Sequence, residues 1–187
     1  MEKQHPFKTH LDKHTTITGS EFELILSYFT EKKIGKNTVL IRSAARVPDT
    51  YWVKTGLLVS SFTDEDGRDH IIQFATENCW ITDQDAFYHQ KNAIFDIMAY
   101  ENCELLCLNF HDREKLCAEI PAMNHFFRRK ANDSFVKQQK RLLTYLTADA
   151  KKRFDLLMEE YPGIQQRVSK KTMAAYLGVS RETLSRL

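Results

Sequence analysis

The strongest constraint on the fold is a change of residue pattern near Leu108. Before it, short runs rich in Val, Ile, Phe, Tyr and Trp are separated by turns, and this pattern favours β-strands. After it, apolar residues recur every three or four positions, which is the spacing of one helix face. We therefore predict an α+β fold in which the sheets come first and the helices last.

The first part of the chain favours an antiparallel barrel or sandwich, because several short strands are separated by turns. The loop Thr63–Gly67 is predicted as a hairpin, since Gly67 can adopt a positive φ. Ahead of the strands, Ser20 and Glu23 match a capping box and predict a helix that Gly35 ends. The predicted strands are Thr38–Arg42, Tyr51–Phe62, His70–Phe74, Ile94–Tyr100 and Glu104–Leu108.

The second part begins with a short predicted helix, Asp112–Ile120, and Pro121 then opens a long one that runs without a break to Leu146. A third helix, Thr147–Tyr161, is ended by Pro162 and Gly163. The long helix carries a spacing typical of a seam shared by two helices, which predicts a dimer; packing on its own domain is the alternative. The seam residues are Phe127, Ala131, Phe135, Gln138, Leu142 and Tyr145.

The last nineteen residues predict a helix, a tight turn and a second helix. Ser169 and Ser180 are N-cap candidates, and Gly178 stands where the chain leaves the first helix in a left-handed conformation. This is the pattern of a helix-turn-helix, whose second helix enters the DNA major groove.

The chemistry of this segment fits double-stranded DNA. Arginine can bond guanine in bidentate fashion and Glu can accept from cytosine, which predicts base contacts from Arg181, Glu182, Ser185 and Arg186. Hydroxyl and ammonium groups at helix starts can hold phosphates, which predicts such contacts from Ser169, Lys170 and Ser180.

The charge distribution agrees with a polyanionic partner. Residues 121–187 carry 14 basic and 6 acidic side chains, a net charge of +8, whereas residues 1–120 carry 13 and 19, a net charge of −6. The alternative interpretation is an ordinary two-helix surface hairpin with a solvated basic face.

The segment Leu-Gly-Val-Ser-Arg-Glu-Thr-Leu-Ser-Arg (177–186) resembles the recognition element of the cyclic-AMP receptor / fumarate-nitrate regulator (Crp/Fnr) superfamily of bacterial transcription regulators. The resemblance extends over nearly the whole chain, through Lys-Thr-Gly-Leu-Leu (54–58) and Asp-Glu-Asp-Gly-Arg-Asp (64–69). Phe-Ala-Thr-Glu-Asn-Cys-Trp-Ile (74–81) looks like the short branch common in Bacteroidetes. By resemblance, Arg181, Glu182 and Arg186 contact bases.

The resemblance also implies an architecture. It gives an antiparallel β-roll (a double-stranded β-helix of the cyclic-nucleotide-binding type) as sensor over 1–120, a dimerisation helix over 121–146 and a helix-turn-helix over 147–187. The family's wing hairpin has no residues after Leu187, so we expect it to be absent or the chain truncated.

The family's cyclic-nucleotide site uses a Gly-Glu pair and an Arg-Ser pair. Here Ile81-Thr82-Asp83 stands in the place of the Gly-Glu pair, and Ala93-Ile94 stands in the place of the Arg-Ser pair. Without an Arg, a buried phosphate lacks its charge-assisted partner, and we expect weak or no cyclic-AMP binding. Another small-molecule effector is expected in the roll, with Phe74, Trp80, Asp83 and Phe87 as candidate pocket residues; plain core is the alternative.

No other chemical site is expected. His10 and His14 lack a third ligand nearby and are interpreted as a solvent-exposed pair, so we expect no metal and no cofactor. Neither a phosphate-binding loop nor a nucleophile elbow is present, which argues against an enzyme. No run is long enough to span a membrane, and we expect a cytoplasmic protein.

The expected function is therefore a homodimeric DNA-binding transcription regulator, with RNA polymerase as a further candidate partner. The competing hypothesis is a β-roll small-molecule sensor whose helical tail docks a protein.

Overall fold

The computed structural model describes residues 5–187 and has the α+β character that the sequence predicts. The strands are β1 (Thr30–Ile34), β2 (Val39–Ile41), β3 (Asp49–Thr55), β4 (Leu58–Thr63), β5 (Asp69–Ala75), β6 (Trp80–Ile81), β7 (Asp96–Ala99) and β8 (Cys103–Asn109). The helices are α1 (Pro6–Asp12), α2 (Gly19–Ser27), α3 (Gln84–His89), α4 (Phe110–Glu119), α5 (Pro121–Thr147), α6 (Ala150–Glu160), α7 (Ile164–Arg167), α8 (Lys170–Leu177) and α9 (Arg181–Ser185).

Two four-stranded antiparallel sheets form the body, in the orders β1-β8-β3-β6 and β2-β7-β4-β5. Val53 and Leu105 from the first sheet and Leu58 and Ile97 from the second are all buried in one cluster. This apolar cluster fills the roll that the two sheets form. The antiparallel two-sheet arrangement predicted from the short strands is therefore confirmed.

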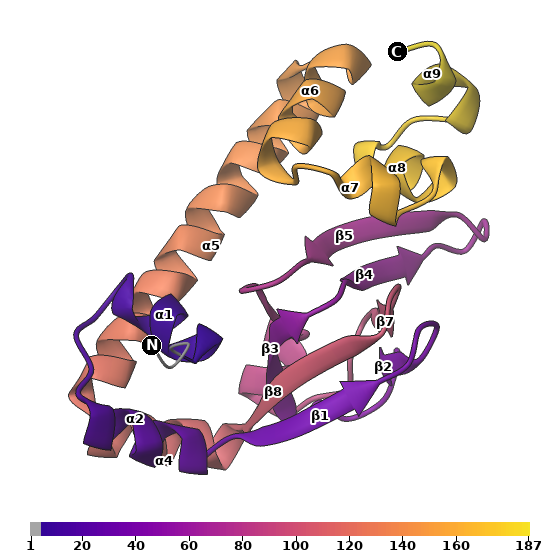
Figure 1. Cartoon of the computed structure of the whole chain (residues 1–187). Helices are drawn as coiled ribbons and strands as arrows, with labels where there is room; N and C mark the ends of the chain where they lie inside the picture. The colour runs from indigo at the N-terminus through magenta and orange to yellow at the C-terminus, as the bar shows by residue number, and fades with distance from the viewer. Residues whose placement is uncertain (1–4) are drawn as a thin grey trace.

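The long helix α5 runs past the sheets and connects two groups of helices (Figure 1). Helices α1, α2 and α4 lie near its start, and α6 to α9 lie at its other end, over the β4–β5 hairpin. Pro121 occupies the first turn of α5, as predicted, where its missing N–H leaves no intrahelical hydrogen bond unmade.

The predicted hairpin at Thr63–Gly67 is also confirmed. β4 pairs with β5 on either side of the loop, the Gly67 amide donates to the Asp64 carbonyl at 3.0 Å, and Gly67 has φ +75°.

The start and end predicted for the first amphipathic helix are wrong. The capping box is formed by Thr18 and Glu21, whose side chains each accept from the other's backbone amide, rather than by Ser20 and Glu23. The sequence contains both matches. Ile17 at N′ and Phe22 at N4 are buried in one cluster, a hydrophobic staple that favours the earlier start.

That helix also ends well before Gly35. Its last residue is Ser27, and Thr30–Ile34 is the edge strand β1, which pairs with β8 from Thr30–Cys107 to Ile34–Cys103. The side chains of β1 are mostly exposed, so only the ladder to a distant strand makes this segment extended.

The single strand predicted over Tyr51–Phe62 is two strands in different sheets. Gly56 separates β3 from β4 with φ +96°, and a Cβ there would lie 2.5 Å from the Asn102 carbonyl oxygen. Only glycine permits both this conformation and this approach of another backbone.

Candidate nucleic-acid interface

Helices α8 and α9 are joined by a tight turn, and each begins at the predicted serine. The Ser169 hydroxyl accepts from the Thr172 amide and the Ser180 hydroxyl from the Thr183 amide, both at 3.1 Å. Gly178 leaves α8 with φ +66°, the left-handed cap that the sequence predicts. These three residues therefore define where each helix begins and where the chain turns.

The turn is also pressed against the end of α5. A Cβ on Gly178 would lie 2.6 Å from the Tyr145 hydroxyl oxygen. Met173, Leu177 and Leu184 are buried in a common cluster, which holds α8 and α9 together.

The four predicted base-contacting residues lie on the exposed side of α9. Arg181, Glu182, Ser185 and Arg186 are all exposed, whereas Leu184 is buried. Hydrogen bonds from its own backbone amide and from Ser180 lower the pKa of Glu182, so this carboxylate is ionised at neutral pH. The Arg186 Nε donates to the Glu182 carbonyl oxygen at 3.3 Å.

The three predicted phosphate-contacting residues are exposed as well. Ser169 and Lys170 lie at the start of α8, and Ser180 lies at the start of α9. Within residues 5–187, Lys170 forms no ion pair, whereas the adjacent Lys171 pairs with Asp69 of β5 at 3.2 Å.

The inner side of α8 is packed on the roll. Leu57, Ile71 and Phe74 of the β4–β5 sheet are buried together with residues of α8. The Phe74 ring stacks on that of Tyr176, with centroids 4.8 Å apart. Figure 1 shows α8 next to β5 and α9 further from the sheets, and Arg181, Glu182, Ser185 and Arg186 are exposed.

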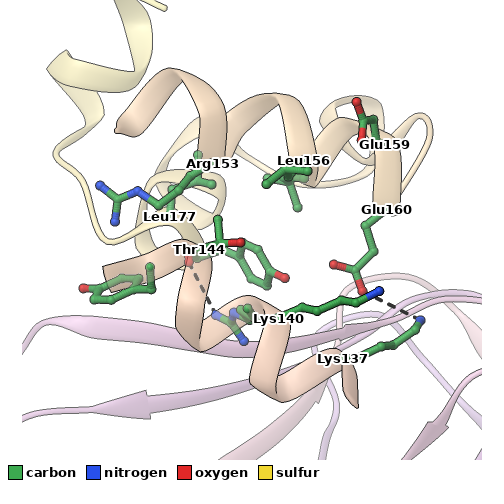
Figure 2. A pocket seen from close by; sticks show the side chains of 12 residues that line it. Lys137, Lys140, Thr144, Arg153, Leu156, Glu159, Glu160 and Leu177 are labelled. Atoms are coloured by element: carbon green, nitrogen blue, oxygen red, sulfur yellow. Dashed lines mark hydrogen bonds and ion pairs between the residues drawn. The ribbon is translucent and has the colours of Figure 1, made fainter. Parts of the chain in front are cut away.

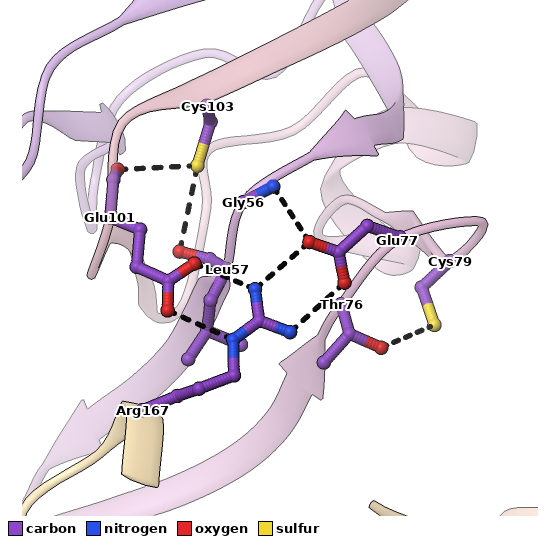
Figure 3. A network of polar contacts seen from close by, with 8 residues as sticks. All are labelled: Gly56, Leu57, Thr76, Glu77, Cys79, Glu101, Cys103 and Arg167. Atoms are coloured by element: carbon purple, nitrogen blue, oxygen red, sulfur yellow. Dashed lines mark hydrogen bonds and ion pairs between the residues drawn. The ribbon is translucent and has the colours of Figure 1, made fainter. Parts of the chain in front are cut away.

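A charged cluster fixes this packing. Arg167, at the end of α7, donates to both carboxylate oxygens of Glu77 at 2.9 Å and to both of Glu101 at 2.6 and 2.9 Å (Figure 3). Glu77 in turn accepts from the Gly56 amide at 2.9 Å. Bidentate guanidinium–carboxylate pairs are the strong, geometrically specific kind of ion pair.

A second cation crosses the same interface. The Arg141 guanidinium of α5 donates to the carbonyls of Ile71 and Ile72 in β5 and to the Tyr176 carbonyl in α8. The same guanidinium lies over the Tyr176 ring, 4.0 Å from the ring centroid. The sequence did not identify Arg141, Arg167, Glu77 or Glu101, because partners 35 to 90 residues apart leave no local pattern.

The structure does not bring the four candidate effector residues together. Phe74 packs against the C-terminal helices, Trp80 against the N-terminal helices, and Phe87 lies inside the roll. Asp83 is buried at the N-terminus of α3, where its carboxylate accepts from the amides of Ala86 and Ile94 at 3.1 and 2.9 Å. These residues are core and capping elements in three separate places.

The six residues of the predicted dimer seam differ in their surroundings on α5. Phe127 is buried within its own chain against Trp80. The Tyr145 ring lies under the Arg153 guanidinium, whose central carbon is 5.1 Å from the ring centroid. Ala131, Phe135, Gln138 and Leu142 are exposed. The large apolar residues exposed on α5 are Phe135, Val136, Leu142, Leu143, Tyr145 and Leu146.

The prediction that His10 and His14 are a solvent-exposed pair is wrong for His10. It is 4% exposed, and its ring lies 5.7 Å from Trp52 and 5.6 Å from Phe126. Burial lowers its pKa to about 4. In the part of the chain that the structure describes, no cluster of three or more His, Cys, Asp or Glu side chains is arranged to hold a metal ion.

Comparison with known proteins identifies the class of the roll. Residues 31–119 match the family model described as the cyclic nucleotide-binding domain. A search of curated protein sequences finds no match.

The chain as a whole has the fold of Crp/Fnr-type transcription regulators. It is similar to the c-di-GMP responsive global regulator CLP of Xanthomonas campestris, with 14% identity over 90% of this chain and 89% of that one, at a TM-score of 0.73. It is also similar to FixK2 of Bradyrhizobium japonicum, with 18% identity over 84% and 81%, at 0.72. A putative regulator of the Crp/Fnr family from Eubacterium rectale has 15% identity over 91% and 81%, at 0.69.

None of the helices between residues 5 and 187 has the length and apolar character that crossing a bilayer needs.

Proposed function

We propose that the chain is a homodimeric transcription regulator that binds a near-palindromic DNA site through α9 and acts in the cytoplasm. The observation that carries the proposal is the division of α9 into two sides. Arg181, Glu182, Ser185 and Arg186 face solvent, while Leu184 holds the helix to α8. An exposed helix face of this chemistry suits base edges in the major groove.

The exposed stripe on α5 supports the dimer. Phe135, Leu142, Leu143 and Leu146 are each at least 60% exposed, and Phe135, Leu142 and Leu146 recur at spacings of seven and four. A second copy of the same helix would cover them, as in a two-helix seam. A symmetric dimer presents two α9 helices to half-sites about 34 Å apart.

We infer that the roll responds to an effector other than cyclic AMP. At the place that the resemblance gives to the ribose-binding pair stands the buried Asp83 carboxylate. Ala93-Ile94 stands where the Arg-Ser pair would be, and the Ile94 amide already donates to Asp83. A phosphate there would meet a carboxylate and no guanidinium. Isothermal titration that showed micromolar cyclic-AMP affinity would overturn this inference.

The test of DNA binding begins with selection of binding sites from a random duplex pool, followed by fluorescence anisotropy on the selected site and on scrambled DNA. We expect Arg181→Ala to cost about 1–3 kcal/mol on the selected site only. Lys170→Ala should weaken both duplexes about equally, because it contacts phosphate. Equal losses on both duplexes for Arg181→Ala would refute base reading.

Salt dependence separates DNA binding from docking of the tail on a protein. Counterion release makes DNA affinity fall steeply with salt, and the logarithm of affinity against the logarithm of salt concentration has a slope of about −0.9 per neutralised phosphate.

Sedimentation of Leu142→Glu tests the dimer, and we expect this variant to be monomeric. Lys152→Glu, on the exposed side of α6, is the control and should remain dimeric.

A further inference from the structure

A cavity of about 380 Å³ lies between α5, α6 and α8, apart from the exposed face of α9 and from the interior of the roll. Leu156, Leu157 and Leu177 line its apolar side (Figure 2). The volume lies within the range of ordinary small-molecule sites, which are mostly apolar with a few placed polar groups.

The polar lining of this cavity is mainly cationic. Four basic side chains reach it, against two carboxylates, Glu159 and Glu160. Two of the cations are already engaged. Arg141 donates to three backbone carbonyls, and Lys137 pairs with Glu160 at 3.8 Å.

The other two cations are not paired. The Arg153 Nε is buried and has no hydrogen-bond partner, and Lys140 forms no ion pair or hydrogen bond with any residue from 5 to 187. The Arg153 guanidinium lies over the Tyr145 ring, 5.1 Å from the ring centroid. A buried donor without an acceptor costs free energy that a bound acceptor recovers.

We propose that this cavity binds a small organic anion that has a carboxylate or similar acidic group on an apolar body. The acidic group pairs with Arg153, and the apolar body lies on the three leucines. Figure 2 shows Lys140 at the opposite end of the cavity from the Arg153 guanidinium, so a second acidic group would pair there.

The cavity remains accessible in the proposed dimer. At 3.6 residues per turn, Lys137, Lys140 and Thr144 lie on the face of α5 opposite to the exposed stripe that contains Phe135 and Leu142. A partner helix on that stripe therefore does not cover the cavity.

An anion in this cavity contacts α5, α6 and α8 together. Given the proposed DNA-binding function, it would shift the equilibrium among orientations of α8 and α9 relative to α5. Binding of the anion is measured on the chain without DNA, so failure of DNA binding and failure of this proposal are separate results.

The experiment uses 1-anilinonaphthalene-8-sulfonate, an aromatic anion whose fluorescence rises in apolar surroundings, and its displacement by octanoate or octylamine. We expect one saturable site per chain that octanoate empties and octylamine does not. Arg153→Gln should weaken octanoate binding about tenfold, the usual effect of losing a hydrogen bond to a charged group. Lys152→Gln, an exposed change on the same helix, is the matched control.

Thr144→Phe tests the cavity by filling it while Arg153 and Lys140 are both retained, and it should abolish binding. Circular dichroism and the unfolding midpoint establish that each variant is folded. The proposal is overturned if no saturable site exists, if octylamine displaces the dye as well as octanoate does, or if folded Arg153→Gln and Thr144→Phe bind octanoate like the unchanged chain.

Discussion

Replacing Arg167 by Ala removes the ion pairs that join the C-terminal helices to the roll. Arg167 makes four hydrogen bonds of 2.6–2.9 Å to Glu77 and Glu101. Its pKa is raised, chiefly by the hydrogen bonds that it donates to Glu101 and Glu77. Burial alone would raise the pKa of Glu77, but hydrogen bonds from Arg167 and from backbone amides lower it overall.

The size of the effect follows from burial. The Arg167 side chain is 25% exposed, and those of Glu77 and Glu101 are 41% and 33% exposed. Exposed ion pairs contribute about 0–1 kcal/mol, and breaking fully buried ones costs about 3–5 kcal/mol. We expect Arg167→Ala to lower the free energy of unfolding by about 2 kcal/mol. The lone carboxylates left behind account for part of this loss.

The assay is urea unfolding followed by tryptophan fluorescence, with the denaturant slope required to stay constant. Lys171→Ala is the matched control: Lys171 joins the same two parts through Asp69 but is 78% exposed, so we expect a loss below about 0.5 kcal/mol. Glu77→Gln completes a double-mutant cycle with Arg167→Ala, and a coupling of about 1 kcal/mol is expected.

Two results would refute this reasoning. One is a loss for Arg167→Ala no larger than that for Lys171→Ala. The other is that Glu77→Gln lowers the free energy of unfolding equally in the presence and absence of Arg167. The two effects would then be independent, and the ion pair would contribute nothing to the docking of the C-terminal helices.

Three further predictions concern backbone conformation, pH and capping. Gly178→Ala should lower the free energy of unfolding by about 1–2 kcal/mol more than Gly67→Ala, because both have positive φ but only Gly178 lies against another side chain; equal losses would contradict this. The pKa of His10 is lowered from 6.5 to about 4, so the contribution of neutral His10 to the free energy of unfolding should be complete above pH 6.5 and fall by about 3 kcal/mol as the pH drops to 4. His10→Phe should remove this part of the pH dependence. An unchanged pH profile of the free energy of unfolding would show that His10 does not cause it. Asp83→Ala leaves the buried Ala86 amide and the partly buried Ile94 amide without their acceptor and should cost about 2–3 kcal/mol, against about 1 kcal/mol for the exposed cap Asp149→Ala. Urea unfolding measures both losses, and the reverse order would refute the assignment.

Local signals in the sequence predicted the caps and the turn of the C-terminal helices. The caps at Ser169 and Ser180 and the left-handed Gly178 depend on residues within a few positions of each other. For the same reason the hairpin at Gly67 and the start of α5 at Pro121 were predicted correctly. The capping box shows the limit of such signals, since two overlapping matches existed and only the burial of Ile17 with Phe22 distinguished them.

The candidate sites depended more on tertiary contacts. Phe74 and Trp80 are separated by five residues in the sequence but belong to different clusters, because β5 and β6 lie in different sheets. Tyr145 was assigned to a dimer seam from its spacing; it is 53% exposed, and its ring also contacts Gly178 and Arg153 of its own chain. A spacing gives the face of a helix, but it does not say which neighbour covers that face.

The sequence by itself determined the caps and the turn of the last two helices, the start of α5 at Pro121, and that the basic third of the chain ends in two short helices with exposed arginines. Helix periodicity, caps and turns act over a few residues, so their signals are local. Only the tertiary structure decided that β1 is a strand, that Arg167 of α7 pairs with Glu77 and Glu101, that Arg141 of α5 bonds both β5 and α8, and that a cationic cavity lies between α5, α6 and α8. These features arise from contacts between segments far apart in the chain, and the free energy of such contacts overrides local preference.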